Sequence, residues 1–212
     1  MVSLFGAIAL CLATLTQANA AEVTDELQQE INDVLAKTEG GVQISQNEIA
    51  WNGGEVIMAF PLPGETHAPV SSSAAQRLQS KVSGLPLDTV EDVAPEPVEP
   101  EEYEEPVGAM ATDSCPTQTF GNDWYCFYQY KDFGGRRLQW SAAYNHYVYF
   151  SSYDFENRTS SWSNKGGKVI GVYGRTVTGS DLSCTNDLWY EQPHSRSASA
   201  SPDNQADCFT TS

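Results

Sequence analysis

The chain has 212 residues, enough for one or two small domains, and a formal net charge of −17. The acidity lies almost entirely in the first half: residues 1–114 carry 3 Lys or Arg against 19 Asp or Glu, whereas residues 115–212 carry 8 against 9. A chain of this charge lacks the basic stripe that binds nucleic acid, and it is not suited to adsorb on an anionic membrane.

The first twenty residues have the pattern of a secretory signal peptide. An apolar run over residues 4–15 leads to Ala18-Asn19-Ala20, which fits signal-peptidase cleavage before Ala21. The usual positive start is missing, and the run is too short for a convincing membrane span. We therefore expect a secreted, extracellular protein with no membrane contact after signal removal.

Residues 21–61 predict a small α+β N-terminal segment that begins with an amphipathic helix. Thr24 and the two acidic residues after it form a helix start, and the helix should end at Gly40-Gly41. The apolar residues that repeat at helical spacing between these points are Leu27, Ile31, Val34 and Leu35.

The rest of this segment predicts a hairpin. Asn52-Gly53 is a strong hairpin turn between two alternating stretches. The expected strands are residues 42–45, 49–51 and 55–60. A helix plus a hairpin is too small to be secure alone, so the segment either docks on the C-terminal region or is a propiece.

Residues 62–112 predict a disordered linker. Prolines and glutamates dominate residues 93–108 (VAPEPVEPEEYEEPVG), a composition that cannot bury enough apolar surface to offset the entropy of ordering. The linker is either a spacer, or an acidic run that shields a cationic face of a partner or is cut during maturation.

The most informative stretch is residues 124–140 (WYCFYQYKDFGGRRLQW). Its first half alternates with a period of two and is apolar on both faces, which predicts a strand covered on both sides. Residues 131–135 then form a turn, in which Phe133 must fold back on the strand to escape water. A second strand follows from Arg136.

Two motifs in this half resemble a known family. Tyr128, Phe133 and Gly135 match the aromatic-x4-aromatic-x-Gly pattern of the folded hairpin in the βγ-crystallin Greek-key motif, where the glycine takes a backbone shape that a Cβ would forbid. Residues 156–161 (ENRTSS) are similar to that family's signature (Asn/Asp)(Asn/Asp)-x-x-(Ser/Thr)-Ser. In a secreted chain, the combination resembles peptidase inhibitor family I36, the microbial metalloproteinase inhibitors of βγ-crystallin type.

The resemblance implies an all-β fold over residues 113–212, a βγ-crystallin-like Greek-key sandwich of two motifs. Tyr173 and Gly179 mark the second hairpin, although Val177 stands where an aromatic belongs and the spacing is one residue short. The repeat distance is about 45 residues. Residues 195–201 (SRSASAS) occupy the expected place of the second signature but lack its Asn or Asp pair.

Further strands are predicted at residues 168–173 and 188–190. Aromatic residues are dense before them, and serve either as core and edge packing or as a surface for a carbohydrate or a protein partner. These residues are Tyr144, Tyr147, Tyr149, Phe150, Tyr153 and Phe155.

Four cysteines remain after signal removal, and four allow three pairings. We expect the local pairing, Cys115–Cys126 and Cys184–Cys208, because each bridge then holds one end of the crystallin-like region. Each should contribute on the order of 3 kcal/mol to stability. The alternative is free thiols.

The resemblance also raises the question of calcium. In crystallin domains that bind it, the signature loops supply oxygen ligands, a role that Glu156, Asn157 and Ser160 could fill here. Alternatively, Ser160 and Ser161 hydrogen-bond backbone groups and hold the two motifs together. No other cofactor is expected.

The chain shows no pattern typical of an enzyme. It holds only His67, His146 and His194, and it has no catalytic serine elbow, zinc-protease motif or phosphate-binding loop. We therefore expect an exported monomeric inhibitor that presents a loop, residues 141–146 or 174–180, to an extracellular protease. The alternatives are a structural or calcium-binding crystallin-like module, or a toxin on the same scaffold.

Overall fold

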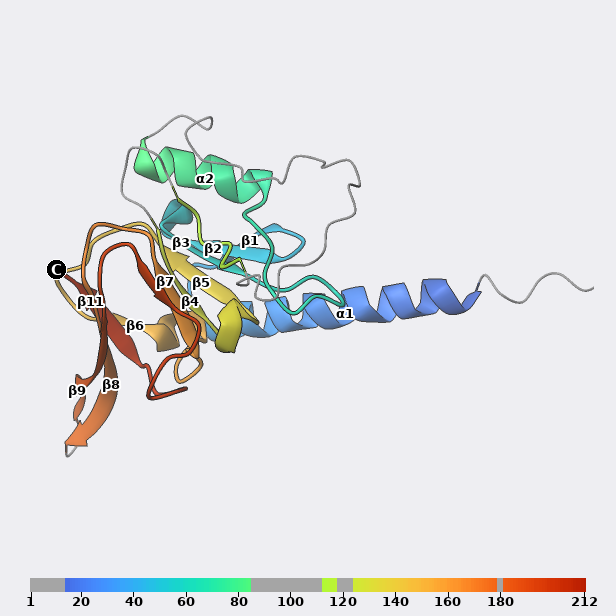
Figure 1. The fold of residues 1–212 in the computed structure, drawn as a ribbon. Helices are drawn as coiled ribbons and strands as arrows, with labels where there is room; N and C mark the ends of the chain where they lie inside the picture. Colours follow the sequence, from blue (N-terminus) through green and yellow to red (C-terminus); the bar gives the residue numbers. More distant parts are fainter. Residues whose placement is uncertain (1–13, 85–111, 118–123, 179–180) are drawn as a thin grey trace, which may run out of the picture.

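The computed structural model describes residues 14–84, 112–117, 124–178 and 181–212. Two antiparallel sheets pack face to face, and two helices lie against the larger sheet (Figure 1). This confirms the all-β prediction. Within the described residues, no helix combines the length and apolar character needed to cross a membrane.

The larger sheet has seven strands in the order β1-β2-β3-β5-β4-β7-β10. These strands are β1 Val42–Ser45, β2 Glu48–Trp51, β3 Val56–Ala59, β4 Tyr125–Tyr128, β5 Arg137–Trp140, β7 Ser161–Asn164 and β10 Ser195–Ser197. The smaller sheet has the order β6-β11-β8-β9. Its strands are β6 Val148–Tyr149, β8 Ile170–Thr178, β9 Asp181–Glu191 and β11 Cys208–Thr211. Short 3₁₀ turns lie at η1 Asn52–Gly54, η3 Lys131–Phe133 and η4 Phe150–Tyr153.

The C-terminal strands form two units with the same connectivity. In the first unit β4, β5 and β7 lie in the larger sheet while β6 lies in the smaller one; in the second, β8, β9 and β11 lie in the smaller sheet while β10 lies in the larger one. The fourth strand of each unit returns beside the first: β7 pairs with β4, and β11 pairs with β8. Because each unit gives its third strand to the other sheet, neither unit can be removed without breaking both sheets.

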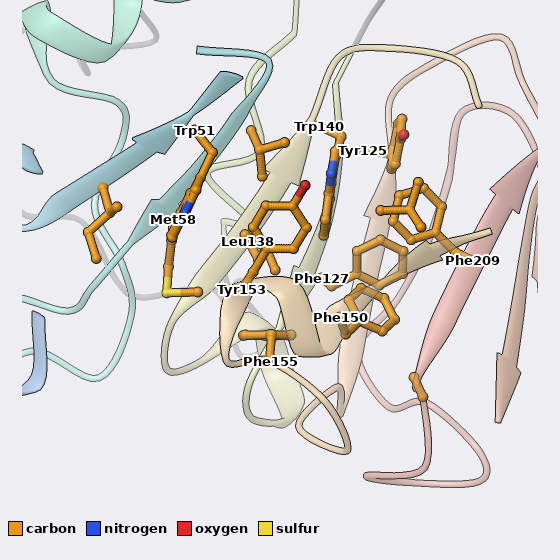
Figure 2. Packing of buried hydrophobic residues seen from close by; sticks show 14 of the residues in the cluster. Trp51, Met58, Tyr125, Phe127, Leu138, Trp140, Phe150, Tyr153, Phe155 and Phe209 are labelled. Carbon is orange, nitrogen blue, oxygen red and sulfur yellow. The ribbon is translucent and has the colours of Figure 1, made fainter. Parts of the chain in front are cut away.

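Aromatic side chains fill the space between the sheets (Figure 2). Phe127 and Trp140 from the larger sheet meet Phe209 from the smaller one, with ring centroids 4.8 Å apart for Trp140 and Phe209 and 5.5 Å for Phe127 and Phe209. Phe150 lies 4.9 Å from Phe127. Of the aromatic residues before β7, Phe150, Tyr153 and Phe155 are core residues.

The N-terminal hairpin forms as predicted, and it joins the larger sheet. Asn52 and Gly53 both take positive φ at the turn. Strand β3 pairs with β5 over four residues, so the possibility that this segment docks on the C-terminal region is the arrangement observed.

The predicted helix start at Thr24 is wrong. Helix α1 spans Thr14–Lys37, because the alanine-rich residues before Thr24 are good helix formers and contain no breaker. It therefore runs through the predicted cleavage point before Ala21.

The linker prediction is wrong for its first part. Helix α2 spans Ser73–Ser83, between an N-cap at Ser72 and a left-handed Gly84. Ala75 is buried against the outer face of the larger sheet, which gives this short helix the tertiary contact it needs. Residues 85–111, which hold the Pro-Glu run, lie outside the described residues.

Candidate functional site

The first hairpin of the C-terminal region, β4–β5, is folded down tightly. The ring of Phe133 packs edge-on against Tyr128, with centroids 5.3 Å apart, and both side chains are buried. Gly135 has φ +73°, and a Cβ there would lie 2.7 Å from the Tyr130 ring. The three residues of the predicted motif therefore meet as the motif requires.

The signature serines hold this hairpin. Ser161 Oγ donates to the carbonyl of Tyr130 at 2.6 Å and accepts from the N–H of Phe133 at 3.0 Å. Ser160 Oγ donates to Asn204 Oδ1 at 3.2 Å, which links the signature loop to the second unit. Ser161 therefore bonds backbone groups of the first hairpin, whereas Ser160 joins the two units through a side chain.

The second hairpin, β8–β9, is long and extends away from the body (Figure 1). Strand β8 pairs with β11 from Ile170 to Tyr173; from Gly174 onward, its strand partner among the described residues is β9. Bulges interrupt the pairing at this point, where a Cβ on Gly174 would lie 3.3 Å from the carbonyl of Gln205. Gly179 of the predicted second motif lies outside the described residues.

Arg175 fastens the root of the projecting hairpin to the body. Its guanidinium donates to Glu156 Oε1 at 2.6 Å and to Ser151 Oγ at 2.9 Å, and lies 5.3 Å from the centroid of the Tyr149 ring. Its backbone N–H donates to Asp207 Oδ2 at 2.5 Å. The incoming arm of the hairpin is therefore held both by its main chain and by its side chain.

A disulfide fastens the outgoing arm. Cys184 in β9 is bonded to Cys208 at the start of β11, and Cys115 is bonded to Cys126 in β4. The predicted local pairing is confirmed. The first bridge joins the segment before β4 to β4 itself, whereas the second joins β9 of the projecting hairpin to β11.

Three tyrosines form a cluster on the surface beside this root. The ring of Tyr173 lies 5.3 Å from that of Tyr147 and 6.4 Å from that of Tyr190, both nearly perpendicular to it. Tyr147 is 39% exposed and Tyr190 53% exposed. Perpendicular rings make a ridge rather than the flat face on which a sugar ring stacks, so the cluster suits a protein surface better than a carbohydrate.

The second signature lies at a place that the sequence interpretation missed. Cys208 faces Tyr173 as Ser161 faces Tyr128, so the counterpart of residues 156–161 is residues 203–208 (DNQADC). The predicted place, residues 195–201, instead contains strand β10. The Asp-Asn pair ahead of a cysteine-led strand was the signal that could have revealed it.

The two signature loops are bonded to each other reciprocally. Asn157 and Asn204 occupy equivalent positions and take the same left-handed backbone, with φ +55° and +54°. The N–H of Asn157 donates to the carbonyl of Ala206 at 2.9 Å, and that of Asn204 to the carbonyl of Thr159 at 3.1 Å. The equivalence of the two units therefore extends from strand order to individual hydrogen bonds.

Comparison with known families agrees with the motifs. Residues 108–185 match the model of peptidase inhibitor family I36. This confirms the predicted family resemblance. The match covers about a third of the chain, from before the first disulfide to Cys184 in the projecting hairpin. No curated protein and no solved structure matches the chain.

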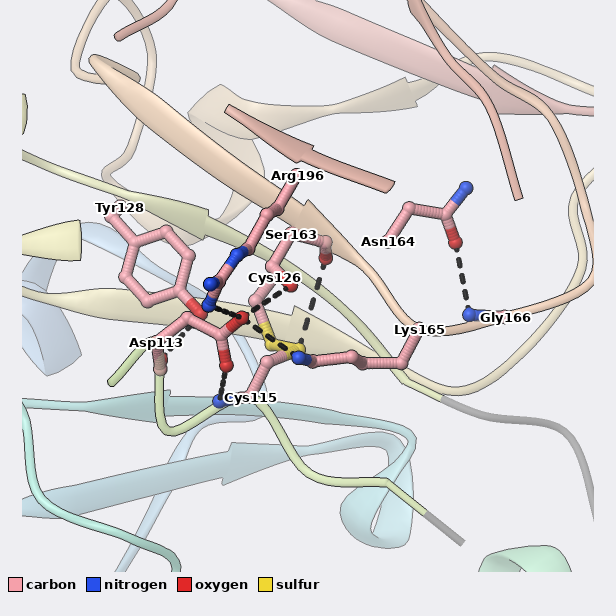
Figure 3. Close-up of polar contacts among 9 residues, drawn as sticks. All are labelled: Asp113, Cys115, Cys126, Tyr128, Ser163, Asn164, Lys165, Gly166 and Arg196. Carbon is pink, nitrogen blue, oxygen red and sulfur yellow. Dashed lines mark hydrogen bonds and ion pairs between the residues drawn. A yellow bond between two sulfur atoms is a disulfide. The ribbon is translucent and has the colours of Figure 1, made fainter. Parts of the chain in front are cut away.

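The start of the I36 match is anchored by the buried carboxylate of Asp113 (Figure 3). It accepts hydrogen bonds from Lys165 Nζ at 2.8 Å, Ser163 Oγ at 2.9 Å and the N–H of Cys115 at 3.1 Å, and lies 3.5 Å from Arg196 Nη1. Burial alone raises the pKa of Asp113. The hydrogen bond and positive charge of Lys165, together with the hydrogen bonds from Cys115 and Ser163, outweigh burial and lower the pKa below its usual 3.8.

Two of the three proposed calcium ligands, Glu156 and Ser160, are engaged within the protein. Glu156 is paired with Arg175, and burial raises its pKa above the usual 4.5, against the effect of Arg175 and helped by Asp207. Ser160 bonds Asn204, as described. Among the described residues, no group of three or more His, Cys, Asp or Glu side chains is placed to hold a metal ion.

The remaining candidate residues lie in separate places. His67 contacts the folded hairpin through the carbonyl of Asp132 at 3.0 Å, while His146 is exposed beside Tyr144 and His194 lies in the turn just before β10. The candidate loop 141–146 is held to β11, since Tyr144 and Thr211 exchange backbone and side-chain hydrogen bonds. It is therefore less free to enter a cleft than the projecting hairpin.

Proposed function

We propose that the protein is a secreted inhibitor of extracellular proteases, metalloproteases in particular, that presents the β8–β9 hairpin to its target. The I36 match supports the inhibitor class. One structural observation supports this hairpin as the contact. From Gly174 onward it extends beyond the neighbouring strand β11, while both of its arms stay fastened at the root.

Such fastening is what an inhibitor needs. A segment that is already ordered loses little conformational entropy on binding, and a segment held at both arms does not separate after cleavage. Arg175 holds one arm and Cys184–Cys208 holds the other. The strand exchange between units, which resembles a βγ-crystallin domain, supplies the stiff frame beneath them.

The tyrosine ridge adds contact area to the hairpin. A stable protease–inhibitor complex buries about 800 Å² on each partner, more than a narrow hairpin end supplies. Tyr147, Tyr173 and Tyr190 lie at the hairpin root, where a protease engaging the tip would place the rim of its cleft. Tyrosine is among the residues enriched in such interfaces.

Secretion fits the same proposal. Two disulfides persist in an oxidising compartment and rarely in a cytosol. The signal-like residues 1–20 provide the route of export.

The test is titration of the purified chain, residues 21–212, against thermolysin-like metalloproteases and a set of secreted serine proteases. We expect stoichiometric inhibition of at least one metalloprotease. The double variant Cys184→Ser/Cys208→Ser should weaken inhibition by about tenfold or more, because the outgoing arm is released. The matched control, Cys115→Ser/Cys126→Ser, removes the bridge that is not in the hairpin. Under conditions in which this variant is folded, its inhibition constant should equal that of the wild type. A folded chain that inhibits no protease would refute the proposal.

A second candidate function is calcium binding at the paired signature loops. Asp207 Oδ1 is buried and has no hydrogen-bond partner, and it lies in the loop that is bonded to Asn157. A cation bound only by the folded state would raise the melting temperature with calcium concentration. A melting temperature that does not change up to millimolar calcium excludes this role.

A further inference from the structure

The N-terminal module, residues 25–84, shares one sheet and one core with the I36 region, the part of the chain that matches the family model at residues 108–185. Strand β3 pairs with β5 over four residues, from Val56 opposite Trp140 to Ala59 opposite Arg137. Trp51 meets Tyr153 edge-on at 5.3 Å. The same hydrophobic cluster also contains Ile31 and Val34 of α1 and Met58 and Phe60 of the β3 segment. Without the module, the edge of β5 and the core beneath it would face water.

Arg136 joins the module to the I36 region on the inner face of this sheet. Its side chain is 3% exposed and lies between two rings, 5.8 Å from Phe60 and 5.9 Å from Phe155. Its charge faces Glu30 of α1 at 3.5 Å and Asp154 at 3.6 Å. Removing the module would take away one carboxylate and one ring and expose a cation that is now buried.

Arg137, the next residue, does the same on the outer face. It is fully buried, and its Nη1 donates to the carbonyls of Pro69 at 2.8 Å and Ala68 at 3.4 Å, both in the module. Two residues before Ala68, the carbonyl of Thr66 accepts a hydrogen bond from the N–H of Gly135 at 2.8 Å. Successive residues of a strand point to opposite faces, so the Arg-Arg pair fastens both sides of the module.

We propose that the N-terminal module is a permanent structural partner of the I36 region rather than a removable propiece. The β5 edge is the interaction surface, and the partner it fits is the chain's own β1–β3 sheet with its two helices. A cut between residues 85 and 111 then produces two fragments that stay assembled. This inference does not depend on the protease proposal, because it concerns the fold that carries the hairpin.

The experiment uses the full chain with a site for a sequence-specific protease inserted within residues 90–105. After complete cutting, verified under denaturing and reducing conditions, the two fragments should elute together from native size exclusion and keep the near-ultraviolet circular dichroism of the uncut chain. Fragments that separate in native buffer overturn the proposal, whether the larger one stays folded or aggregates.

Variants of the cut chain identify the contacts. Arg136→Ala and Arg137→Ala should each raise the dissociation constant of the two fragments by about tenfold or more. Arg136→Ala removes the contacts with Phe60 and Glu30, and Arg137→Ala leaves the carbonyls of Ala68 and Pro69 without this donor. The matched control is Lys131→Ala, which removes an exposed cation whose partner, Asp203, is in the same fragment. If both arginine variants dissociate no more readily than the control, these contacts do not hold the fragments together and the inference fails.

Discussion

The two hairpins at equivalent places in the C-terminal repeat have opposite shapes. In β4–β5 the arms are four residues each, and Phe133 folds the turn back onto Tyr128. In β8–β9 the arms are nine and eleven residues long and continue past the sheet. One position in the fold thus supports both a closed element and a projecting one.

The sequence difference between them is small. The second unit keeps Tyr173 but has Val177 where the first has Phe133, so no second ring is available to cover the hairpin. The fastening changes accordingly: Ser161 holds the first turn by hydrogen bonds, whereas Cys208, its counterpart, is bonded to Cys184. The comparison teaches that one repeated strand order accommodates a hairpin closed by two packed rings and a hairpin that projects beyond its sheet neighbour.

The largest effect is expected from Phe133→Ala. Removing a buried phenylalanine ring should cost about 3–4 kcal/mol of unfolding free energy. The backbone cost is unchanged, because both residues must take the same positive φ of 63°. Urea denaturation measures the loss, and the inhibition constant per folded molecule should stay the same if closure of the first hairpin serves only stability. A parallel loss of inhibition at full folding would contradict the division of roles.

Gly135→Ala should cost about 2–3 kcal/mol, because a left-handed backbone penalises any Cβ and this one would also meet the Tyr130 ring. The matched control is Gly64→Ala, which has φ +85° but no heavy atom within 4 Å of the added Cβ. It should cost only the backbone penalty of about 1 kcal/mol. Equal losses for both variants would show that the close approach at Gly135 has no energetic weight.

The contrast between the hairpins also explains what the sequence could predict. Tyr128, Phe133 and Gly135 form a local pattern whose geometry is set by near neighbours, and the disulfide pairing followed from short separations. The pairing of β3 with β5 joins residues about eighty positions apart in the sequence. The residues of either strand do not indicate which other strand it pairs with. The projection of β8–β9 was hidden for the same reason, since it follows from where β11 begins, at Cys208 opposite Tyr173.

The missed elements carried weaker signals. Ser72 and Gly84 are ordinary helix caps, but the proline-rich run that follows dominated the reading of this segment. The second signature at residues 203–208 lacks the final serine, because Cys208 is bonded to Cys184. The sequence signal of this second signature is the pair Asp203-Asn204, which stands five and four residues before Cys208.

Asp113→Asn tests the anchor of the closed half, with an expected loss of about 2 kcal/mol at pH 7, since the charged hydrogen bonds weaken and two partly exposed cations lose their partner. The pKa of Asp113 is lowered in the folded state, so its contribution is present above pH 3.8 and is lost as the pH falls through the folded value. The difference between variant and wild type should therefore shrink on acidification. The control is Asp203→Asn, whose side chain is 39% exposed. A difference that does not shrink as the pH falls below 3.8 would contradict the assignment.

Glu191→Gln, at the far end of β9, should have the smallest effect and the opposite sign. Glu191 is fully buried; this burial raises its pKa well above 4.5, despite a hydrogen bond from Trp189 at 3.1 Å, and its second oxygen has no partner. A raised pKa means that the group favours folding only at low pH and that this contribution disappears as the pH rises. The amide, which never ionises, should therefore stabilise the protein by on the order of 1 kcal/mol near neutral pH and by nothing below pH 4. Thermal melting of the variant and of the exposed control Asp187→Asn across this range measures it. A variant that is less stable than wild type at pH 8 would mean that the ionised carboxylate has a partner, and that the root of the projecting hairpin is held by a charge rather than by burial.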